Sequence, residues 1–499
     1  MHNQKQTPAI TSMAKTNAQK EKRSMSITSF LRQVPWRRLA FLAIYVLAFL
    51  LVPFLAGFVN LGIKTYGSTA SIPHAAYTGP FPTPTYDPTK KIAVVMASYS
   101  GDEITDALPT FEILARSGAF NVYMVAPERK VLPFVASNMN ADTGLDFVPH
   151  FSFADYTKKI GKKPDLIAIP YLSGYTPTRD VAVVNWIRAN TGPHTIIDGI
   201  CFGTMTLADT GLLNGHQATT NTVIFNQLQT HFPNVRWMRN VRYVDDGNII
   251  TSTNLASGMD ATLHVVSRLA GRSVAEDVAR QIGYTHTTYL DNPRFQYPAL
   301  PIGPLLENAA FSWHQDRLGV LLYDGVSELD LAGLLDPYTS SLTAKAYVFA
   351  PKRAPITSRD GLILIPRYDL QTVPSLDRVV LPGGETNSSQ HQALAAWNSL
   401  HADRQAESIQ RNVGHGETAF EATIQDLARR YNGPLASAIA DILFVPDAKL
   451  PADARLPIEP LAMPLLLGLI GIGLVFALSR LRFRRHTPVR SSTVAASHA

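Results

Sequence analysis

The sequence predicts an α/β protein: a parallel-sheet sandwich followed by a second, incomplete copy, with a transmembrane helix on either side. Short apolar runs of strand length alternate with helical patterns from residue 91 onward, which is typical of a parallel sheet with helices on both faces. A weaker version of this pattern starts at Arg317. Two uncharged apolar segments, 39–59 and 461–479, flank both copies and are long enough to cross a bilayer.

The first copy is expected to occupy residues 91–285. Its strands contain continuous apolar runs, as expected where helices cover both faces of a parallel sheet and bury side chains on each face. Its helices show apolar residues at a spacing of three or four. We expect strands at 91–98, 121–126, 165–170, 194–200 and 248–252, and helices at 101–118, 181–190, after Gly203 through Leu213, and 259–269.

The second copy is expected at 317–446, after a linker at 286–316. Its strands at 318–323, 346–351 and 378–384 resemble the first three strands of the first copy, but no second cysteine turn follows. Residues 405–446 show a helical pattern. The sequence therefore predicts an internal duplication whose second half is incomplete. One hypothesis is that the two copies pack together and bury the truncated sheet of the second.

The two apolar segments predict membrane helices at 39–61 and 461–479, the first followed by a Pro-rich stalk at 62–90. Gly468 and Gly471 are small enough to pack against another helix. A cleaved signal peptide is the alternative for the first segment, and Arg37-Arg38 weakly suggests twin-arginine export. The apolar run is longer than a signal peptide needs, which favours an uncleaved anchor.

The charges predict the orientation in the membrane. The tail 1–38 holds eight Lys or Arg and one acidic residue, and the tail 480–499 holds five Arg and no acidic residue. Positively charged flanks of membrane helices face the cytoplasm. We therefore expect both tails on the cytoplasmic side of a bacterial inner membrane and the main domain on the opposite side. The net charge of +6 comes from these tails, and the basic pI is no sign of nucleic-acid binding.

Cys201 is the single cysteine and stands where an apolar strand gives way to a helix, between Gly199 and Gly203. Such a nucleophile elbow presents a side chain, and the amides at the start of the next helix lower the pKa of a thiol. The alternative is an inert buried thiol, because free cysteine is among the most buried residue types. The turn by itself leaves both interpretations open.

Beyond Cys201, several blocks in order resemble the ThiJ/PfpI superfamily, with its flavodoxin-like, class I glutamine-amidotransferase-like fold. The resemblance covers about 91–285 and is greatest to the isonitrile-hydratase-like proteins and to the amidase-like domain of AraC-type regulators. Residues 317–446 are similar to the same family with its central portion missing. The blocks are 208–215, 218–220, 232–236, 244–248, 251–252, 258–260 and 275–280.

The resemblance implies an acidic residue beside the cysteine at the start of the first helix. The matching residue is Asp106, with Asp330 in the second copy, and Glu103 one turn earlier is a rival. Asp106 is expected to hydrogen-bond the thiol or move a proton. Its alternative role is that of an ordinary acid at a helix N-terminus. Cys201 and Asp106 are therefore the candidate catalytic pair.

Three departures from the family pattern weaken hydrolase chemistry. Asn221 stands where many relatives have histidine, and Phe202 follows the cysteine where protease-like members have histidine. Tyr171-Leu172 replaces the glycines whose amides help to form an oxyanion hole. A Cys–His hydrolase needs a base, and the histidines nearest in sequence are expected on the surface or in loops: His194, His216 and His231. Protease and glutaminase activities are not expected.

We interpret the protein as a membrane-anchored, degenerate ligand-binding or sensory domain for an unknown small molecule. The alternative is a cysteine-dependent hydratase or amidase that uses Cys201 and Asp106, and the sequence leaves open whether the protein is an enzyme. Redox sensing by the same thiol is a third hypothesis. No metal, cofactor or direct nucleic-acid partner is expected, and the resemblance implies a homodimer.

Overall fold

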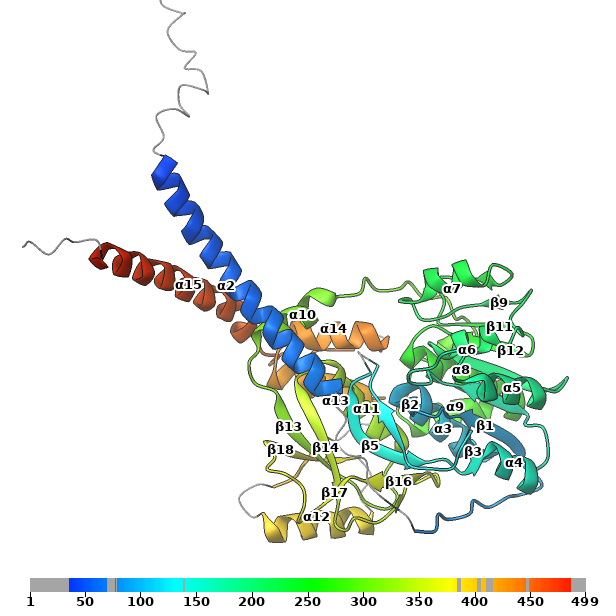
Figure 1. Ribbon diagram of the computed structural model, residues 1–499. Helices are drawn as coiled ribbons and strands as arrows, with labels where there is room; N and C mark the ends of the chain where they lie inside the picture. Colours follow the sequence, from blue (N-terminus) through cyan, green and yellow to red (C-terminus); the bar gives the residue numbers. More distant parts are fainter. Residues whose placement is uncertain are drawn as a thin grey trace, which may run out of the picture. The chain divides into compact units, whose positions relative to one another are not determined.

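The computed structural model describes residues 36–69, 77, 79–137, 140–383, 387–401, 405–409, 416–445 and 448–485 (Figure 1). The chain divides into two compact units. One comprises the segments up to Ala56 and from Ala462, and the other comprises Gly57–Leu461. Gly384 and the tails 1–35 and 486–499 lie outside the described residues.

The first unit contains most of two apolar helices, α2 (Trp36–Thr69) and α15 (Ile458–Arg485). Both are long and apolar enough to cross a membrane, over Arg38–Gly67 and Ile458–Leu481. A Cβ atom added to Gly468 would lie 2.5 Å from the ring of Phe49, and one on Gly471 would lie 2.4 Å from the carbonyl oxygen of Ala48. The glycines thus let α15 pack closely against α2, as the sequence suggested.

Two boundaries near the first apolar segment were wrong. Helix α2 continues to Thr69, beyond the expected end at residue 61. The later part of the expected stalk is not a free extended chain, because Phe81 packs against Val148 and Ile365. Its backbone is also bound to the body: the hydroxyl of Tyr123 donates to the carbonyl oxygen of Thr85 over 2.7 Å.

The first copy forms a seven-stranded sheet in the order β11-β12-β8-β7-β1-β3-β6. All neighbouring strands are parallel except β11 and β12. The central strands are buried along nearly their whole length, as their continuous apolar sequences require. The strands are β1 (Lys91–Met96), β3 (Phe120–Ala126), β6 (Phe151–Ser152), β7 (Leu166–Ile169), β8 (Ile196–Ile200), β11 (Tyr243–Asp246) and β12 (Ile249–Ser252).

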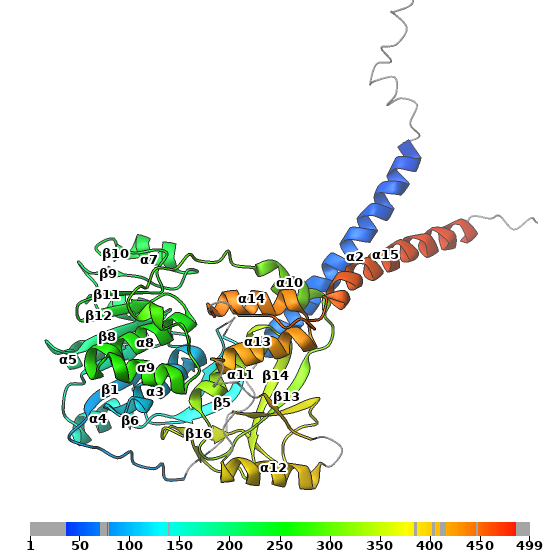
Figure 2. The same ribbon diagram turned by 180° about the vertical axis from the view of Figure 1, so that it is seen from behind.

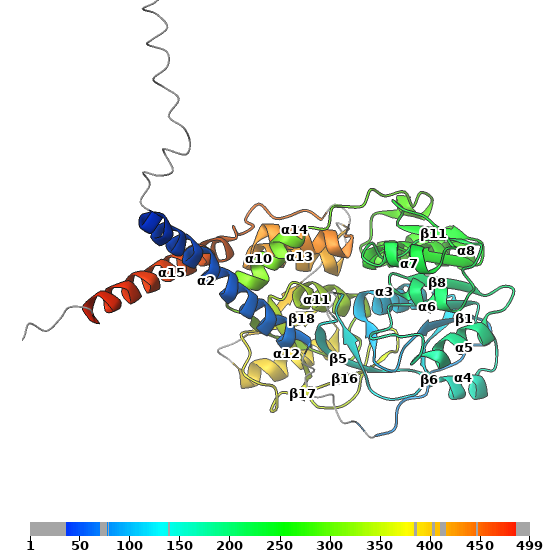
Figure 3. The ribbon, with the colours of Figure 1, turned by 45° about the horizontal axis from the view of Figure 1, so that its top comes forward.

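Helices connect these strands and cover the sheet (Figure 3). They include one helix beyond the last that the sequence predicted, α9, whose buried face contains Ala275, Val278 and Ala279. The parallel α/β architecture of the first copy is confirmed. The helices are α3 (Ile104–Arg116), α4 (Phe153–Lys159), α5 (Val181–Asn190), α6 (Gly203–Asp209), α7 (Phe225–His231), α8 (Leu255–Ala270) and α9 (Arg272–Gln281), with β9 (Gln217–Ala218) pairing β10 (Arg236–Trp237) beside them.

The second copy forms a five-stranded parallel sheet in the order β17-β14-β13-β18-β19. Residues 407–409 are strand β19, so the prediction of helix throughout 405–446 was wrong there. The elements are β13 (Asp316–Leu321), α11 (Glu328–Ser340), β14 (Ala344–Ala350), β17 (Tyr368–Asp369), β18 (Arg378–Pro382), α12 (Ser388–Leu400), β19 (Glu407–Ile409), α13 (Ala419–Arg430) and α14 (Gly433–Leu443).

The two copies share a third sheet, in the order β15-β16-β5-β4-β2. Strand β16 of the second copy pairs antiparallel with β5 of the first, with Ile363 opposite Val148 and Leu364 opposite Phe147. The two copies therefore pack together as hypothesised, but the contact is made by a shared sheet and by the helices α3 and α11 and does not rest on burial of the truncated sheet. The strands are β2 (Asp102–Glu103), β4 (Leu132–Val135), β5 (Asp142–Val148), β15 (Ile356–Thr357) and β16 (Ile363–Pro366).

The connection at 286–316 is more structured than a linker. It contains a short 3-10 helix (Thr287–Leu290) and helix α10 (Ile302–Phe311). Helix α10 packs against α14 of the second copy, and the two lie side by side in Figure 2. The side-chain amide of Asn60 in α2 donates to the carbonyl oxygens of Ala309 and Ala310 over 3.2 and 3.0 Å. This contact fixes the end of α2 to α10.

Candidate functional site

Cys201 lies at a strained turn between β8 and α6. Its φ of +55° is in the left-handed region, which a residue with a side chain occupies only when its surroundings hold it there. The Cys201 amide donates to the carbonyl oxygen of Ser252 over 3.2 Å. A Cβ atom at Gly203 would lie 1.9 Å from the carbonyl oxygen of Ile169, so only glycine fits there. The expected nucleophile elbow is present.

The thiol of Cys201 is buried, with 3% of the residue exposed. The side-chain amide of Asn221 donates to Sγ over 3.1 Å. Burial raises the pKa of the thiol well above its usual range, and the charges of Asp106 and Glu103 raise it further against the opposing Asn221 hydrogen bond. The thiol is therefore protonated near neutral pH, because burial outweighs the hydrogen bonds from Asn221 and from the Phe202 amide at the start of α6, both of which lower its pKa.

The two acidic candidates lie at the start of α3, and the structure brings both near Cys201. Asp106 is fully buried. Its Oδ2 accepts from the Tyr171 amide over 3.0 Å, and its Oδ1 has no hydrogen-bond partner among the described residues. Glu103 caps α3, accepting from the amides of Thr105 and Asp106. Burial raises the pKa of both carboxyls well above the ordinary range, and their mutual proximity adds to this for Glu103.

The turn Tyr171-Leu172, which stands in place of the expected glycine pair, has a different role in this chain. The Tyr171 amide is bound to Asp106, and the Tyr171 carbonyl accepts from the Glu103 amide over 2.9 Å. The ring of Tyr171 packs on Phe202, with 4.9 Å between the ring centroids. An amide already donating to a carboxylate cannot also stabilise an oxyanion at the thiol. The turn therefore supports the acid beside the cysteine.

A cavity of about 500 Å³ contains the cysteine. Its polar groups come from the first copy, including Glu103, Tyr171 and Asn221. Its apolar wall comes from elements that the sequence did not connect with the site: the end of α2, the helix α10 and the second copy. The sequence led us to expect a linker at 286–316, although the helical spacing of the apolar residues in 300–311 could have predicted an amphipathic helix there. These wall residues are Leu61, Leu300, Ile302, Leu305, Leu306, Ala309, Leu342 and Ile442.

Histidine, lysine and arginine are absent from the described lining of this cavity. The histidines nearest to Cys201 in sequence lie elsewhere. His194 and His231 are exposed, and His216 contacts Asp246 over 3.1 Å. The expectation that they are surface or loop residues is confirmed. Within the described residues, no imidazole is therefore placed to deprotonate the thiol.

The second copy has a polar cavity at the position equivalent to the cysteine site. It has a volume of about 660 Å³ and is lined by residues that include Asp330, Arg359 and Gly383. Asp330 lies close to Gly383: a Cβ atom there would be 3.3 Å from the carboxylate. Asp330 thus keeps the position of Asp106, but the sequence has no cysteine for it to face.

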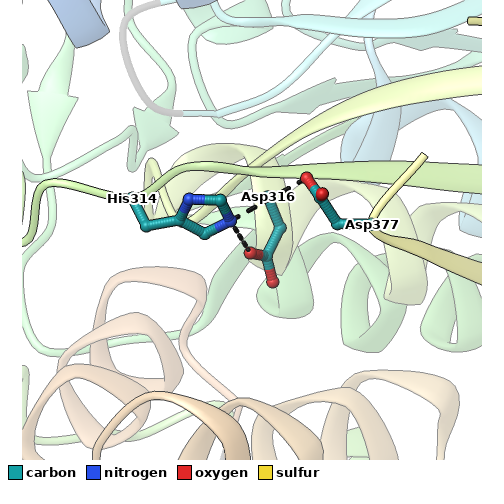
Figure 4. Close-up of side chains that lie close together, drawn as sticks. All are labelled: His314, Asp316 and Asp377. Atoms are coloured by element: carbon teal, nitrogen blue, oxygen red, sulfur yellow. Dashed lines mark ion pairs between the residues drawn. The ribbon is translucent and has the colours of Figure 1, made fainter. Parts of the chain in front are cut away.

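Two groups of side chains have their oxygen and nitrogen atoms close enough to hold a metal ion. Nε2 of His314 lies 2.8 Å from a carboxylate oxygen of Asp316 and 3.8 Å from one of Asp377 (Figure 4). This group is explained as an exposed ion pair. The second group is Glu112, Glu328 and Asp360, and Arg359 supplies its positive charge. We assign no metal to either.

Comparison with known proteins agrees with this geometry. Residues 90–268 match the model of the DJ-1/PfpI family. The isonitrile hydratase of Pseudomonas putida is 27% identical over 190 residues, which make up 38% of this chain and 76% of that protein. The HTH-type transcriptional regulator CdhR of Pseudomonas aeruginosa is 30% identical over 122 residues, which make up 24% of this chain and only 35% of the regulator.

Solved structures were compared as well. A mutant of a DJ-1 superfamily protein from Salmonella typhimurium is 20% identical, with a TM-score of 0.34, and the match covers 39% of this chain and 99% of that one. An AraC family transcriptional regulator from Pseudomonas putida is 16% identical, with a TM-score of 0.32, and the match covers 38% of this chain and 98% of that one.

Proposed function

Because residues 90–268 form a DJ-1/PfpI family domain, we propose that the protein is a membrane-anchored sensor that binds a small molecule at Cys201 without converting it. The observation that supports this most directly is the state of the thiol. Burial and two neighbouring acids keep it protonated, and its hydrogen-bond donor is the uncharged Asn221. A nucleophilic cysteine needs a lowered pKa or an adjacent base.

The lining of the cavity also contacts the second copy, which a sensor requires. Ser137 donates from its amide and its hydroxyl to Oδ1 of Asp336 in α11, each over 3.0 Å. The side-chain amide of Asn254 donates to the carbonyl oxygen of Ile442 at the end of α14 over 3.3 Å. A ligand that displaces these cavity residues would change contacts on both α11 and α14. The second copy is then the element that receives the signal.

Anchoring is part of the same proposal. Two helices are long and apolar enough to cross a membrane, and basic tails lie outside both of them. By the positive-inside rule the tails are cytoplasmic and the cysteine domain lies outside the inner membrane. Alkaline phosphatase fused after residue 290 should be active, and the same enzyme fused at residue 499 should be inactive. Activity of both fusions, or of only the second, would contradict the orientation.

The second candidate function is hydration of an isonitrile, which the strained elbow and the adjacent Asp106 favour. The relative that matches over most of its length is an isonitrile hydratase. The reaction adds water to R–N≡C and gives the formamide R–NH–CHO. In this scheme the Cys201 sulfur would bond to the isonitrile carbon, Asp106 would give its proton to that carbon, and the thiol proton would pass to Asp106, which gives a thioimidate R–N=CH–S. Water would then add to the same carbon, with one of its protons going to the nitrogen. Loss of the sulfur, which takes up the other proton, would leave R–NH–CHO and the free thiol.

Alkylation of Cys201 distinguishes the two functions, since the chain has no other cysteine. The rate of iodoacetamide labelling of the full chain is measured against pH by intact mass. The sensor proposal expects a thiol pKa above the unperturbed value of about 8.5 and no hydration of cyclohexyl isonitrile. Asp106→Asn should lower that pKa, because the Asp106 charge raises it. A thiol pKa below about 7, together with turnover that Cys201→Ser abolishes, would establish the hydratase instead.

A further inference from the structure

The cavity at Cys201 has two chemically different ends. The polar end is formed by the first copy and holds Cys201 with the side chains of Asn221, Tyr171 and Glu103. The other end is formed mostly by aliphatic side chains from α2, α10 and α14, together with Val223. Most of this wall therefore lies outside the residues 90–268 that match the family. A cavity divided in this way fits a molecule with a small polar head and an apolar remainder.

The apolar end opens onto an exposed apolar rim. Val223 is 67% exposed, Ile302 52%, Leu306 47% and Leu300 39%, and all four line the cavity. Three of them belong to α10 or to the residues just before it. Large aliphatic residues grouped at the mouth of a cavity indicate contact with an apolar ligand or surface. They lower the cost of moving a hydrocarbon chain into the protein.

The charges of the lining exclude an ionic ligand. Among the described lining residues Glu103 is the single acid, and no basic residue is present. Glu103 accepts from two amides of α3, and burial raises its pKa, so it offers little negative charge to a cation. An anion would find no positive partner, and burying an unpaired charge is strongly unfavourable. The cavity of the second copy differs from the Cys201 cavity, because charged side chains line it: Arg359, Asp324 and Asp330.

The chain also connects the cavity with an apolar, bilayer-length helix. Leu61 lines the cavity and lies two residues after the apolar run that ends at Val59, on the same helix α2. Next to it, Asn60 fixes α2 to α10 through three backbone carbonyls. The apolar wall of the cavity thus includes a residue of the helix whose earlier part is the proposed membrane anchor. Hydrocarbons partition into bilayers, so a protein anchored in a bilayer meets such ligands at high local concentration.

We propose that the Cys201 cavity binds an uncharged amphiphile with a hydrocarbon chain, taken from the membrane, whose polar head lies at Cys201 and Asn221 and whose chain lies along α10. This inference rests on the proposed function and names its ligand class. Amides, alcohols and aldehydes of long-chain acids have this chemistry. Fatty acids and alkylamines have the same chain but carry a charge, and they serve as matched probes.

The test uses the full chain in lipid nanodiscs. Dodecanamide, dodecanoate, dodecylamine and hexanamide are compared at equal membrane mole fraction, with empty nanodiscs as the blank. The amount of radiolabelled probe retained by the protein gives the affinity. Protection of Cys201 from N-ethylmaleimide shows that the probe is bound in the Cys201 cavity. We expect dodecanamide to bind at least about tenfold more tightly than the other three, because its extra methylenes are buried and it carries no charge. Equal binding of the charged probes or of hexanamide would overturn the inference.

Leu306→Lys tests the site itself. It places a cation at an exposed rim position, so the fold is expected to persist, and dodecanamide binding should fall at least about tenfold while dodecanoate binding rises. Leu400→Lys makes the same change at a residue of α12 that is 60% exposed and outside the cavity lining, and it should leave both affinities unchanged. If neither variant changes binding, the ligand class is wrong. Turnover of an isonitrile would instead refute the sensor proposal while leaving the ligand class intact.

Discussion

Glu112 and Asp336 occupy the same position, the ninth residue, of the thirteen-residue helices α3 and α11. Each binds the N-terminal region of the other helix. Oε2 of Glu112 accepts from the Leu329 amide and the Ser327 hydroxyl, both over 2.8 Å. Oδ2 of Asp336 accepts from the hydroxyl of Thr105 over 2.7 Å. The two copies are therefore joined by a reciprocal contact with approximate two-fold symmetry. The positive end of α11 also favours the charge of Glu112, which accepts from a backbone amide there.

The first prediction concerns this contact. Glu112 is fully buried and pairs with Arg116 and Arg359, so Glu112→Gln removes a charge that two cations need. We expect the free energy of unfolding to fall by about 3 kcal/mol. Urea denaturation of the full chain in detergent measures this. The control is Glu276→Gln, whose pair with Arg272 is exposed and should contribute less than about 1 kcal/mol. A similar small change in both variants would show that the contact is not structurally important.

The duplication could be predicted from the sequence, but the contact between the two copies could not. Strands of a parallel sheet have continuous apolar sequences, and β1 and β13 stood out for that reason. The shared sheet depends on β16, which has only four residues, and on β5, which contains the polar Asp142 and Asp146. Those two acids are buried only because Arg367 of the second copy binds both. Nothing local in the sequence indicates a partner more than 200 residues away.

The candidate site could likewise be predicted only in its local features. Cys201 and its elbow were visible because glycines at a strand-to-helix turn have a local steric cause. The pKa of the thiol could not be predicted, since it depends on burial by residues far along the chain. The helical part of the expected stalk and the apolar helix α10 were also missed. Their positions are fixed by Asn60 binding the carbonyls of Ala309 and Ala310, a contact between segments about 250 residues apart.

The second prediction is that acid weakens the joint between the copies through His150. This buried imidazole accepts from the Met124 amide at Nδ1, while Nε2 lies 3.1 Å from the carbonyl of Gly361 in the second copy. Burial lowers its pKa from 6.5 to about 4. The folded state thus disfavours the proton, so its stability is full above pH 6.5 and declines as the pH falls toward 4.

His150→Gln keeps one acceptor and one donor but does not titrate. The thermal midpoint of the full chain should therefore fall less steeply for this variant than for the wild type between pH 6.5 and 4.5. Although burial opposes it, the charges of Arg359 and Arg116 lower the pKa of Glu112, so Glu112 loses its charge only below this pH range and does not interfere with the comparison. The matched control is His231→Gln, an exposed histidine. Parallel pH profiles for His150→Gln and the wild type would contradict the assignment.

The third prediction concerns Asp198, three residues before the cysteine in β8. Its carboxyl is fully buried, and neither oxygen has a hydrogen-bond partner among the described residues. Burial raises its pKa from 3.8 to about 8. The folded state binds this proton when the unfolded chain does not, so stability falls as the pH rises from 3.8 to 8. The cost at pH 7 is on the order of 4 kcal/mol.

Asp198→Asn should therefore raise the unfolding midpoint at pH 8 and change it little near pH 4. Since an amide in this position also lacks partners, the gain should be a part of that cost, about 1–3 kcal/mol. Asp277→Asn, at an exposed position, provides the control. Thermal unfolding at both pH values measures the effect. A loss of stability at pH 8 would mean that Asp198 is ionised and bound to a partner.

The fourth prediction is that one substitution can activate the thiol. Asn221 donates to the Cys201 sulfur over 3.1 Å, at the position where relatives were expected to carry histidine. Asn221→His would place an imidazole beside the sulfur, and transfer of the proton would give a thiolate–imidazolium pair. The iodoacetamide labelling rate at pH 7 should rise at least about tenfold. Asn221→Leu removes the donor that lowers the pKa, and its rate should fall. If both variants react at the wild-type rate, burial alone controls the thiol, and residue 221 has no part in its ionisation.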